Sequence, residues 1–119
     1  MEGIRLPFID SKVTVKLNKE KKDILKAKLA NIIKNIPGKS ENYLMIGFQD
    51  EYSLYFQGKE LNYGAFIEVK IFGKASKESL DKVTKEICEL YELELNIPQN
   101  AIYIKYEEVE NWGFNGFNF

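Results

Sequence analysis

Apolar and polar residues alternate at the start of the chain and then change to a helical spacing. From Ile9 to Leu17 the apolar residues alternate with polar neighbours, which is the period of a half-buried strand. Across residues 19–36 the apolar positions follow helical spacing, with lysines on the opposite face. Pro37-Gly38 predicts the end of this helix, and the apolar run 43–48 predicts a buried strand.

The same order of elements returns 58 residues later. "PFIDSKV" at 7–13 aligns with "AFIEVKI" at 65–71, and the alignment needs no gap. Asn18 aligns with Ser76, and both residue types are good helix N-caps. The second unit is therefore predicted as a strand, a helix and a strand, over residues 65–72, 77–94 and 101–107.

Two such units predict an α/β (α+β) fold. A strand, a crossover helix and a strand form a right-handed unit with parallel strands. Two units would give a four-stranded sheet with both helices on one face. The uncovered face would carry charged and aromatic side chains, and such a face favours association with other subunits. The side chains expected there are Asp10, Lys12, Glu68, Lys70, Phe8, Phe66 and Phe72.

Composition narrows the classes of function. The 119 residues suit one domain, and the net charge is −1. The chain has no histidine, so no metal site or triad can use one, and we expect no metal or cofactor. Its single arginine is Arg5, which makes nucleic-acid binding a poor expectation. Cys88, the only cysteine, is expected as a buried small apolar residue and fits a reducing, cytoplasmic location. We expect no membrane span, while secretion without a signal peptide stays open.

Several segments in this order resemble the macrophage migration inhibitory factor family of the tautomerase superfamily. They are "PFIDSKV", "GKSENYLMIGF", "FGKAS" and the terminal "IPQNAIYIKYEEVENWGFNG". The resemblance implies a homotrimer whose sheets surround a central channel, with active sites between adjacent subunits.

The resemblance also implies chemistry at Pro7. In the family the initiator methionine is removed, and the amine of the terminal proline acts as general base in keto–enol tautomerisation of an α-keto acid such as phenylpyruvate. A general base works best when its pKa is near the working pH, and an apolar surrounding lowers the pKa of an amine. Without the resemblance, Pro7 would be read as a proline at the start of a strand.

Other positions match the family's substrate-binding residues. Lys39 matches the lysine that holds the substrate carboxylate, although a lysine after a helix end is most often simply solvated. Phe72 matches a residue that contributes its backbone. Lys105 stands in place of an asparagine and would add a second cation. The expected aromatic wall and rim comprise Tyr43, Trp112, Phe114, Phe119 and, from the neighbouring subunit, Tyr103.

Two alternatives to an enzyme stay open. One is a non-catalytic interaction protein, since relatives include cytokine-like members. The other is a trimer that binds a small ligand without turning it over. Turnover by a chain with a free Pro7 amine would separate the enzyme from both.

Residues 1–6 are expected to be a leader outside the native mature protein, with a single domain over 7–119. Its repeats are about 7–48 and 65–106, and a tail covers 107–119. Leu6 could be encoded by TTG, a codon with which bacteria also start translation, and Met-Glu-Gly can be spelled with a ribosome-binding sequence. We hypothesise that Leu6 is the true start of a bacterial gene; a tag is the alternative. As written, Pro7 is blocked, so this chain is expected to be inactive.

Overall fold

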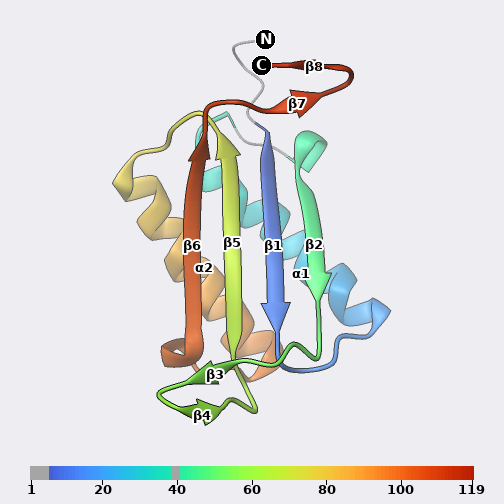
Figure 1. The fold of residues 1–119 in the computed structure, drawn as a ribbon, viewed down its shortest axis with the longest axis vertical. Helices are drawn as coiled ribbons and strands as arrows, with labels where there is room; N and C mark the ends of the chain where they lie inside the picture. Colours follow the sequence, from blue (N-terminus) through green and yellow to red (C-terminus); the bar gives the residue numbers. More distant parts are fainter. Residues whose placement is uncertain (1–5, 39–40) are drawn as a thin grey trace.

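Four strands form one mixed sheet in the computed structural model, which describes residues 6–38 and 41–119 (Figure 1). The strand order is β2-β1-β5-β6. β1 is parallel to β2, β5 is parallel to β6, and the two central strands β1 and β5 are antiparallel. The two predicted strand–helix–strand units are therefore confirmed. The elements of the two units are β1 (Pro7–Val13), α1 (Lys19–Ile32) and β2 (Met45–Gln49), then β5 (Ala65–Phe72), α2 (Lys77–Leu95) and β6 (Ile102–Val109).

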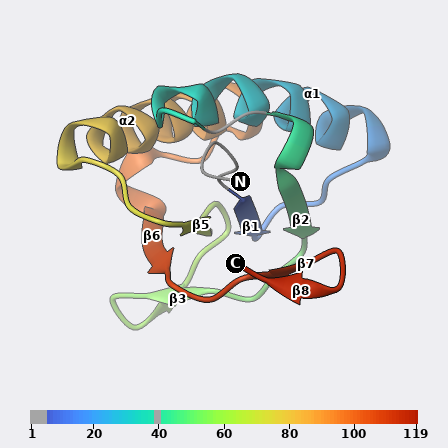
Figure 2. The same cartoon turned by 90° about the horizontal axis from the view of Figure 1, so that it is seen from above.

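Both helices cover one face of the sheet, as predicted (Figure 2). Side chains of β1 and β5 alternate between fully and partly buried, so the apolar set faces the helices. Asn18 and Ser76 cap α1 and α2 by accepting backbone N–H groups, as their residue types predict. The helix positions that align between the repeats are all buried: Leu25 with Val83, Leu29 with Ile87, and Ile32 with Leu90.

Two small hairpins lie on the other side of the sheet, away from the helices (Figure 2). They are β3 (Tyr55–Phe56) with β4 (Lys59–Glu60), and β7 (Gly113–Phe114) with β8 (Phe117–Asn118). Each closes through a two-residue turn with both φ angles positive, Gln57-Gly58 and Asn115-Gly116, which is the type I′ geometry. These turns are also 58 residues apart, so the repeat continues through the hairpins into residues 107–119.

The boundaries of several elements differ from the predictions. The first strand stops at Val13 and not at Leu17, because its partner β5 begins at Ala65, directly opposite Val13. The first helix becomes a 3₁₀ turn at Ile33–Asn35. Tyr43 was predicted to begin a strand, but it lies in a 3₁₀ turn, Glu41–Tyr43, before β2. A third 3₁₀ turn, Gln99–Ala101, precedes β6.

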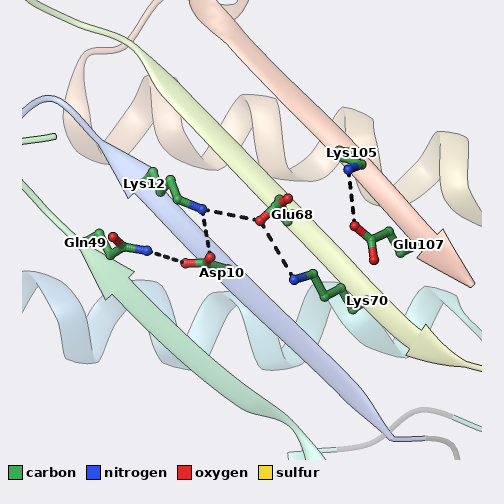
Figure 3. A network of polar contacts seen from close by, with 7 residues as sticks. All are labelled: Asp10, Lys12, Gln49, Glu68, Lys70, Lys105 and Glu107. Atoms are coloured by element: carbon green, nitrogen blue, oxygen red, sulfur yellow. Dashed lines mark hydrogen bonds and ion pairs between the residues drawn. The ribbon is translucent and has the colours of Figure 1, made fainter. Parts of the chain in front are cut away.

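The open face of the sheet carries the predicted charged side chains (Figure 3). Lys12 Nζ lies 2.8 Å from Asp10 Oδ2 and 3.3 Å from Glu68 Oε2. Burial would raise the pKa of Asp10, but hydrogen bonds from Lys12 and Gln49 outweigh it and hold that pKa below its usual value. The hydrogen bond to Asp10 raises the pKa of Lys12. Lys70 Nζ lies 3.9 Å from Glu68 Oε2 and completes a row of opposite charges.

The same face shows that the two repeats are related by an approximate twofold axis. Asp10 pairs directly with Glu68, its own equivalent in the second repeat. On either side of this pair, Lys12 Nζ lies 5.8 Å from the ring centre of Phe66, and Lys70 Nζ lies 5.9 Å from that of Phe8. Each contact is the repeat equivalent of the other.

Two further expectations concern Cys88 and the absence of a membrane-spanning helix. Cys88 is buried on α2, as predicted, and burial raises the pKa of its thiol. Neither helix in the described part of the chain has the length and apolar character that crossing a membrane requires.

Candidate functional site

A cavity of about 520 Å³ opens at the end of the sheet where β1 begins. The start of β1 and the β7–β8 hairpin lie at this end (Figure 1). We call this the Pro7-end cavity. It is lined by Leu6, Phe8, Asn42, Tyr43, Leu44, Met45, Trp112, Gly113 and Phe114.

Aromatic rings form a continuous series at this end. Phe114 lies edge-on to Tyr43, with ring centres 6.0 Å apart, and stacks on Phe119 at 6.3 Å. Phe119 also lies 5.9 Å from Phe72 and 6.2 Å from Phe117. Such offset and edge-on pairs are favourable arrangements and leave ring faces available to a further aromatic group. An aromatic ligand therefore matches this end of the sheet.

The backbone at Pro7 continues the central strand pairing. Pro7 is buried and pairs with Ile71, and the Phe72 N–H donates to the carbonyl oxygen of Leu6 at 3.0 Å. In this chain the Pro7 nitrogen is bonded to Leu6 and is therefore an amide without usable basicity. A chain starting at Pro7 would place a secondary amine there, beside the Phe72 N–H.

Four of the predicted residues meet at the cavity or its rings, and two others lie just beside it. Tyr43, Trp112 and Phe114 line the cavity, and Phe119 contacts Phe114. Pro7 and Phe72 are adjacent to Leu6, but among the described residues neither they nor Phe119 line the cavity itself. Lys39, the predicted carboxylate ligand, lies outside the described residues.

Tyr103 and Lys105 do not reach the Pro7-end cavity within one chain. Tyr103 pairs with Phe66, six residues from Phe72 on β5, so it lies about 20 Å along the sheet from the Pro7 end. Lys105 pairs with Glu68 near the middle of the sheet, where its Nζ lies 3.2 Å from Glu107 Oε1. The resemblance assigns Tyr103 to a neighbouring subunit, and this separation is compatible with that expectation.

A second cavity, of about 250 Å³, lies at the opposite end. We call it the Ala65-end cavity. Seven of its nine lining residues are the repeat equivalents of residues in the Pro7-end cavity, including Phe66 for Phe8 and Asn100 for Asn42. Its lining comprises Leu54, Tyr55, Phe56, Leu61, Ala65, Phe66, Asn100, Ala101 and Tyr103.

Several residues of the Pro7-end cavity were not predicted from the sequence. Leu6 was assigned to a leader, and Asn42, Leu44, Met45 and Gly113 were not considered. Asn42 and Gly113 adjoin predicted site residues, so proximity in sequence could have suggested them. Met45 enters because it pairs with Phe8 across β1 and β2, and that register is set only by the folded sheet.

Comparisons with known proteins identify the family. A profile described as macrophage migration inhibitory factor (MIF) matches residues 6–119. The structure is similar to that of Leishmania major MIF2, with a TM-score of 0.88 and 30% sequence identity, over 96% of this chain and 97% of that one. It is also similar to a macrophage migration inhibitory factor homologue from Prochlorococcus marinus, with a TM-score of 0.78 and 29% identity, over 94% and 98% of the two chains.

A third structure, a macrophage migration inhibitory factor-like protein from Entamoeba histolytica, shares the fold. Its TM-score is 0.83 at 23% identity, over 95% of this chain and 98% of that one. A search of curated proteins found no match. The family profile covers nearly the whole chain, and the mixed sheet with two helices is the MIF-like tautomerase fold. The chain therefore belongs to the macrophage migration inhibitory factor family.

Proposed function

We propose that this protein, when its chain begins at Pro7, is a tautomerase that interconverts the keto and enol forms of an aromatic α-keto acid such as phenylpyruvate. The main support is the position of Pro7 at the end of the sheet that also carries the series of aromatic rings. Family membership supports the reaction class.

The proposed base is the secondary amine of Pro7. Its lone pair takes a proton from the carbon next to the substrate's keto group, and the electrons of that C–H bond form the enol double bond. The carbonyl π electrons move to the keto oxygen, which takes a proton back from the protonated Pro7 amine, so the amine is restored. Apolar surroundings disfavour a charged ammonium, which keeps such an amine unprotonated near neutral pH.

Binding is proposed to use the aromatic rings and two anchors for oxygen atoms. The substrate ring would pack among Tyr43, Trp112 and Phe114, which line the cavity. The Phe72 N–H, which binds the Leu6 carbonyl in this chain, would donate to a substrate oxygen when Leu6 is absent. Lys39 is proposed to hold the carboxylate, from the resemblance alone.

Tyr103 and Lys105 are proposed to complete the site from a neighbouring subunit of a homotrimer. Within one chain they lie at or toward the opposite end of the sheet. The half-buried charged face of the sheet would then lie inside the trimer. Light scattering coupled to size exclusion would test this, and a monomer at micromolar concentration would contradict it.

The decisive assay compares the chain as written with one that begins at Pro7. The buried core cluster runs from Ile9 to Ile102, so removal of residues 1–6 leaves it complete. Only the Pro7-initiated chain should catalyse enol-to-keto conversion of phenylpyruvate. Pro7→Ala in that chain should lower kcat about 10²–10⁴-fold, the usual contribution of a general base. An inactive Pro7-initiated chain that is folded by circular dichroism would refute the tautomerase.

The chain as written favours a non-catalytic alternative. Its Pro7 nitrogen is an amide and cannot act as the base. In that form the protein would be an interaction protein or a small-ligand-binding trimer. We propose that residues 1–6 are absent from the native mature protein and that it is cytoplasmic. N-terminal sequencing and cell fractionation of the native protein would check both points, and a native chain beginning at Met1 would contradict the first.

A further inference from the structure

Leu6 lies between Pro7 and the Pro7-end cavity. It is 3% exposed and lines the cavity, whereas Pro7, Phe72 and Phe119 do not line it among the described residues. The position of Leu6 is held by its carbonyl, which accepts the Phe72 N–H at 3.0 Å.

The second repeat provides an internal comparison for this arrangement. Gly64 is the equivalent of Leu6, and its carbonyl accepts the Thr14 N–H at 3.1 Å, just as Leu6 accepts from Phe72. The backbone is therefore the same at the two ends, but Gly64 has no side chain. At this end Ala65, the equivalent of Pro7, lines its cavity.

The space at the second end is also used differently. A Cβ atom on Gly64 would lie 2.5 Å from Leu61 Cδ1, so Leu61 already takes the space beside the backbone there. Leu61 lines the Ala65-end cavity, while its equivalent Phe119 does not line the Pro7-end cavity. A leucine side chain therefore lines each cavity beside this backbone, Leu6 at one end and Leu61 at the other.

From this difference we infer that Leu6 is an internal plug, whose side chain keeps aromatic carboxylates away from Pro7. This inference concerns access to the proposed site in the chain as written and rests on the proposed function for its biological meaning. The residue before Pro7 then has two separate effects. Its peptide bond removes the basicity of the nitrogen, and its side chain closes the path to it.

The two effects separate in a variant that removes the side chain and keeps the peptide bond. Leu6→Gly copies Gly64 in the full-length chain. We expect it to bind 3-phenylpropanoate, a carboxylate with an aromatic ring and no reactive keto group, about tenfold or more tightly than the unmodified chain. That factor corresponds to the free energy of burying part of an aromatic ring. Leu6→Met keeps an apolar side chain of similar size and serves as the matched control, with binding as weak as in the unmodified chain.

Trp112 provides the readout, because it lines the cavity and is the only tryptophan in the chain. Titration of its fluorescence with 3-phenylpropanoate measures binding in the unmodified chain, Leu6→Gly, Leu6→Met and the Pro7-initiated chain. Tight binding by Leu6→Gly and the Pro7-initiated chain only would support the plug. Equal affinity in all four chains would overturn it. So would tight binding by the Pro7-initiated chain if the affinity of Leu6→Gly is no higher than that of Leu6→Met. Circular dichroism confirms that each variant is folded.

The same set of proteins keeps this inference distinct from the tautomerase. Leu6→Gly should bind without turning over phenylpyruvate, because its Pro7 nitrogen is still an amide. If the Pro7-initiated chain binds tightly yet catalyses nothing, the plug stands and the tautomerase fails. If it catalyses the reaction while Leu6→Gly binds no better than the unmodified chain, the tautomerase stands and the plug fails.

Discussion

The two ends of the sheet have the same architecture but different chemistry. Each has the start of a central strand, the start of an edge strand and a type I′ hairpin placed over them by the other repeat. Individual backbone hydrogen bonds also recur. The Phe119 N–H donates to the carbonyl oxygen of Trp112 at 2.9 Å, and the Leu61 N–H donates to that of Leu54 at 2.9 Å. The two repeats therefore form two similar cavities.

Several of the residues to which chemistry is assigned differ between the two ends, although Phe114 has an identical equivalent in Phe56. Pro7 corresponds to Ala65, Tyr43 to Ala101, and Trp112 to Leu54. The Ala65 end cannot supply a terminal amine, because Ala65 is in the middle of the chain. The fold therefore tolerates a cavity at both ends, while only one of them is equipped for the proposed reaction.

The largest expected effect on stability concerns a polar pair that breaks the symmetry of the core. Ser11 Oγ lies 2.7 Å from the hydroxyl oxygen of Tyr91, which is fully buried, and the equivalents of this pair are Val69 and Ile33. Burial raises the pKa of Tyr91 to about 12. Ser11→Ala leaves the hydroxyl without its partner and should lower the free energy of unfolding by about 1–3 kcal/mol, measured by urea denaturation.

A double variant tests the cause of that loss. Ser11→Ala with Tyr91→Phe removes both polar groups and should cost less than the sum of the two single changes. Strict additivity would show that the hydrogen bond does not couple the two residues.

The next effect is expected from a substitution that makes the Pro7 end resemble the Ala65 end. Trp112→Leu in the Pro7-initiated chain copies Leu54 and removes part of the aromatic wall. The value of kcat/KM for phenylpyruvate should fall about tenfold, as expected for the loss of one aromatic contact. Leu93→Ala, at an exposed position on α2, is the control and should change nothing. An unchanged kcat/KM for Trp112→Leu would remove Trp112 from the proposed site.

A smaller effect tests whether the two hairpins are equivalent. Gly58 and Gly116 have φ angles of +77° and +92°, and a Cβ atom at either would meet nothing within 4 Å. Alanine should therefore cost only the conformational penalty, about 1 kcal/mol at each position. Thermal unfolding of Gly58→Ala and Gly116→Ala should show similar shifts. A much larger shift for one would mean that its hairpin has an additional structural role.

The smallest effect concerns Asp10, which pairs with Glu68 at the twofold axis. The lowered pKa of Asp10 means that its ionised form stabilises the folded chain. This contribution is present above the unfolded pKa, near 3.8, and is lost as the pH falls through the lower folded value. The stability difference between the unmodified chain and Asp10→Asn should therefore shrink as the pH falls from 5 toward about 3. A difference that does not change with pH would contradict it.

Much of the fold could be predicted from residue patterns. The alternation in β1 and β5 and the helical spacing before Pro37 follow from burial on one face, which is a local property of the sequence. The boundaries were less accurate, because Val13 ends its strand only where its partner strand begins. The β7–β8 hairpin was missed, although Asn115-Gly116 is a strong signal for a type I′ turn.

The site was predicted through resemblance, and its parts fared differently. Tyr43, Trp112, Phe114 and Phe119 do gather near Pro7, from segments far apart in the sequence. Lys39 stays a prediction. The position of Leu6 could not be predicted, because whether a residue before a strand projects into a cavity depends on what packs around it.

Residue patterns alone predict that the chain repeats, that each repeat is a strand, a helix and a strand, and that Pro7 begins the first of them. These properties depend on periodicity and on residue identity, both of which can be read locally. The antiparallel pairing of β1 and β5, which places the equivalents of one cavity at the opposite end of the sheet, emerges only in the folded chain. The same is true of Leu6, which lines the Pro7-end cavity because of packing between distant segments.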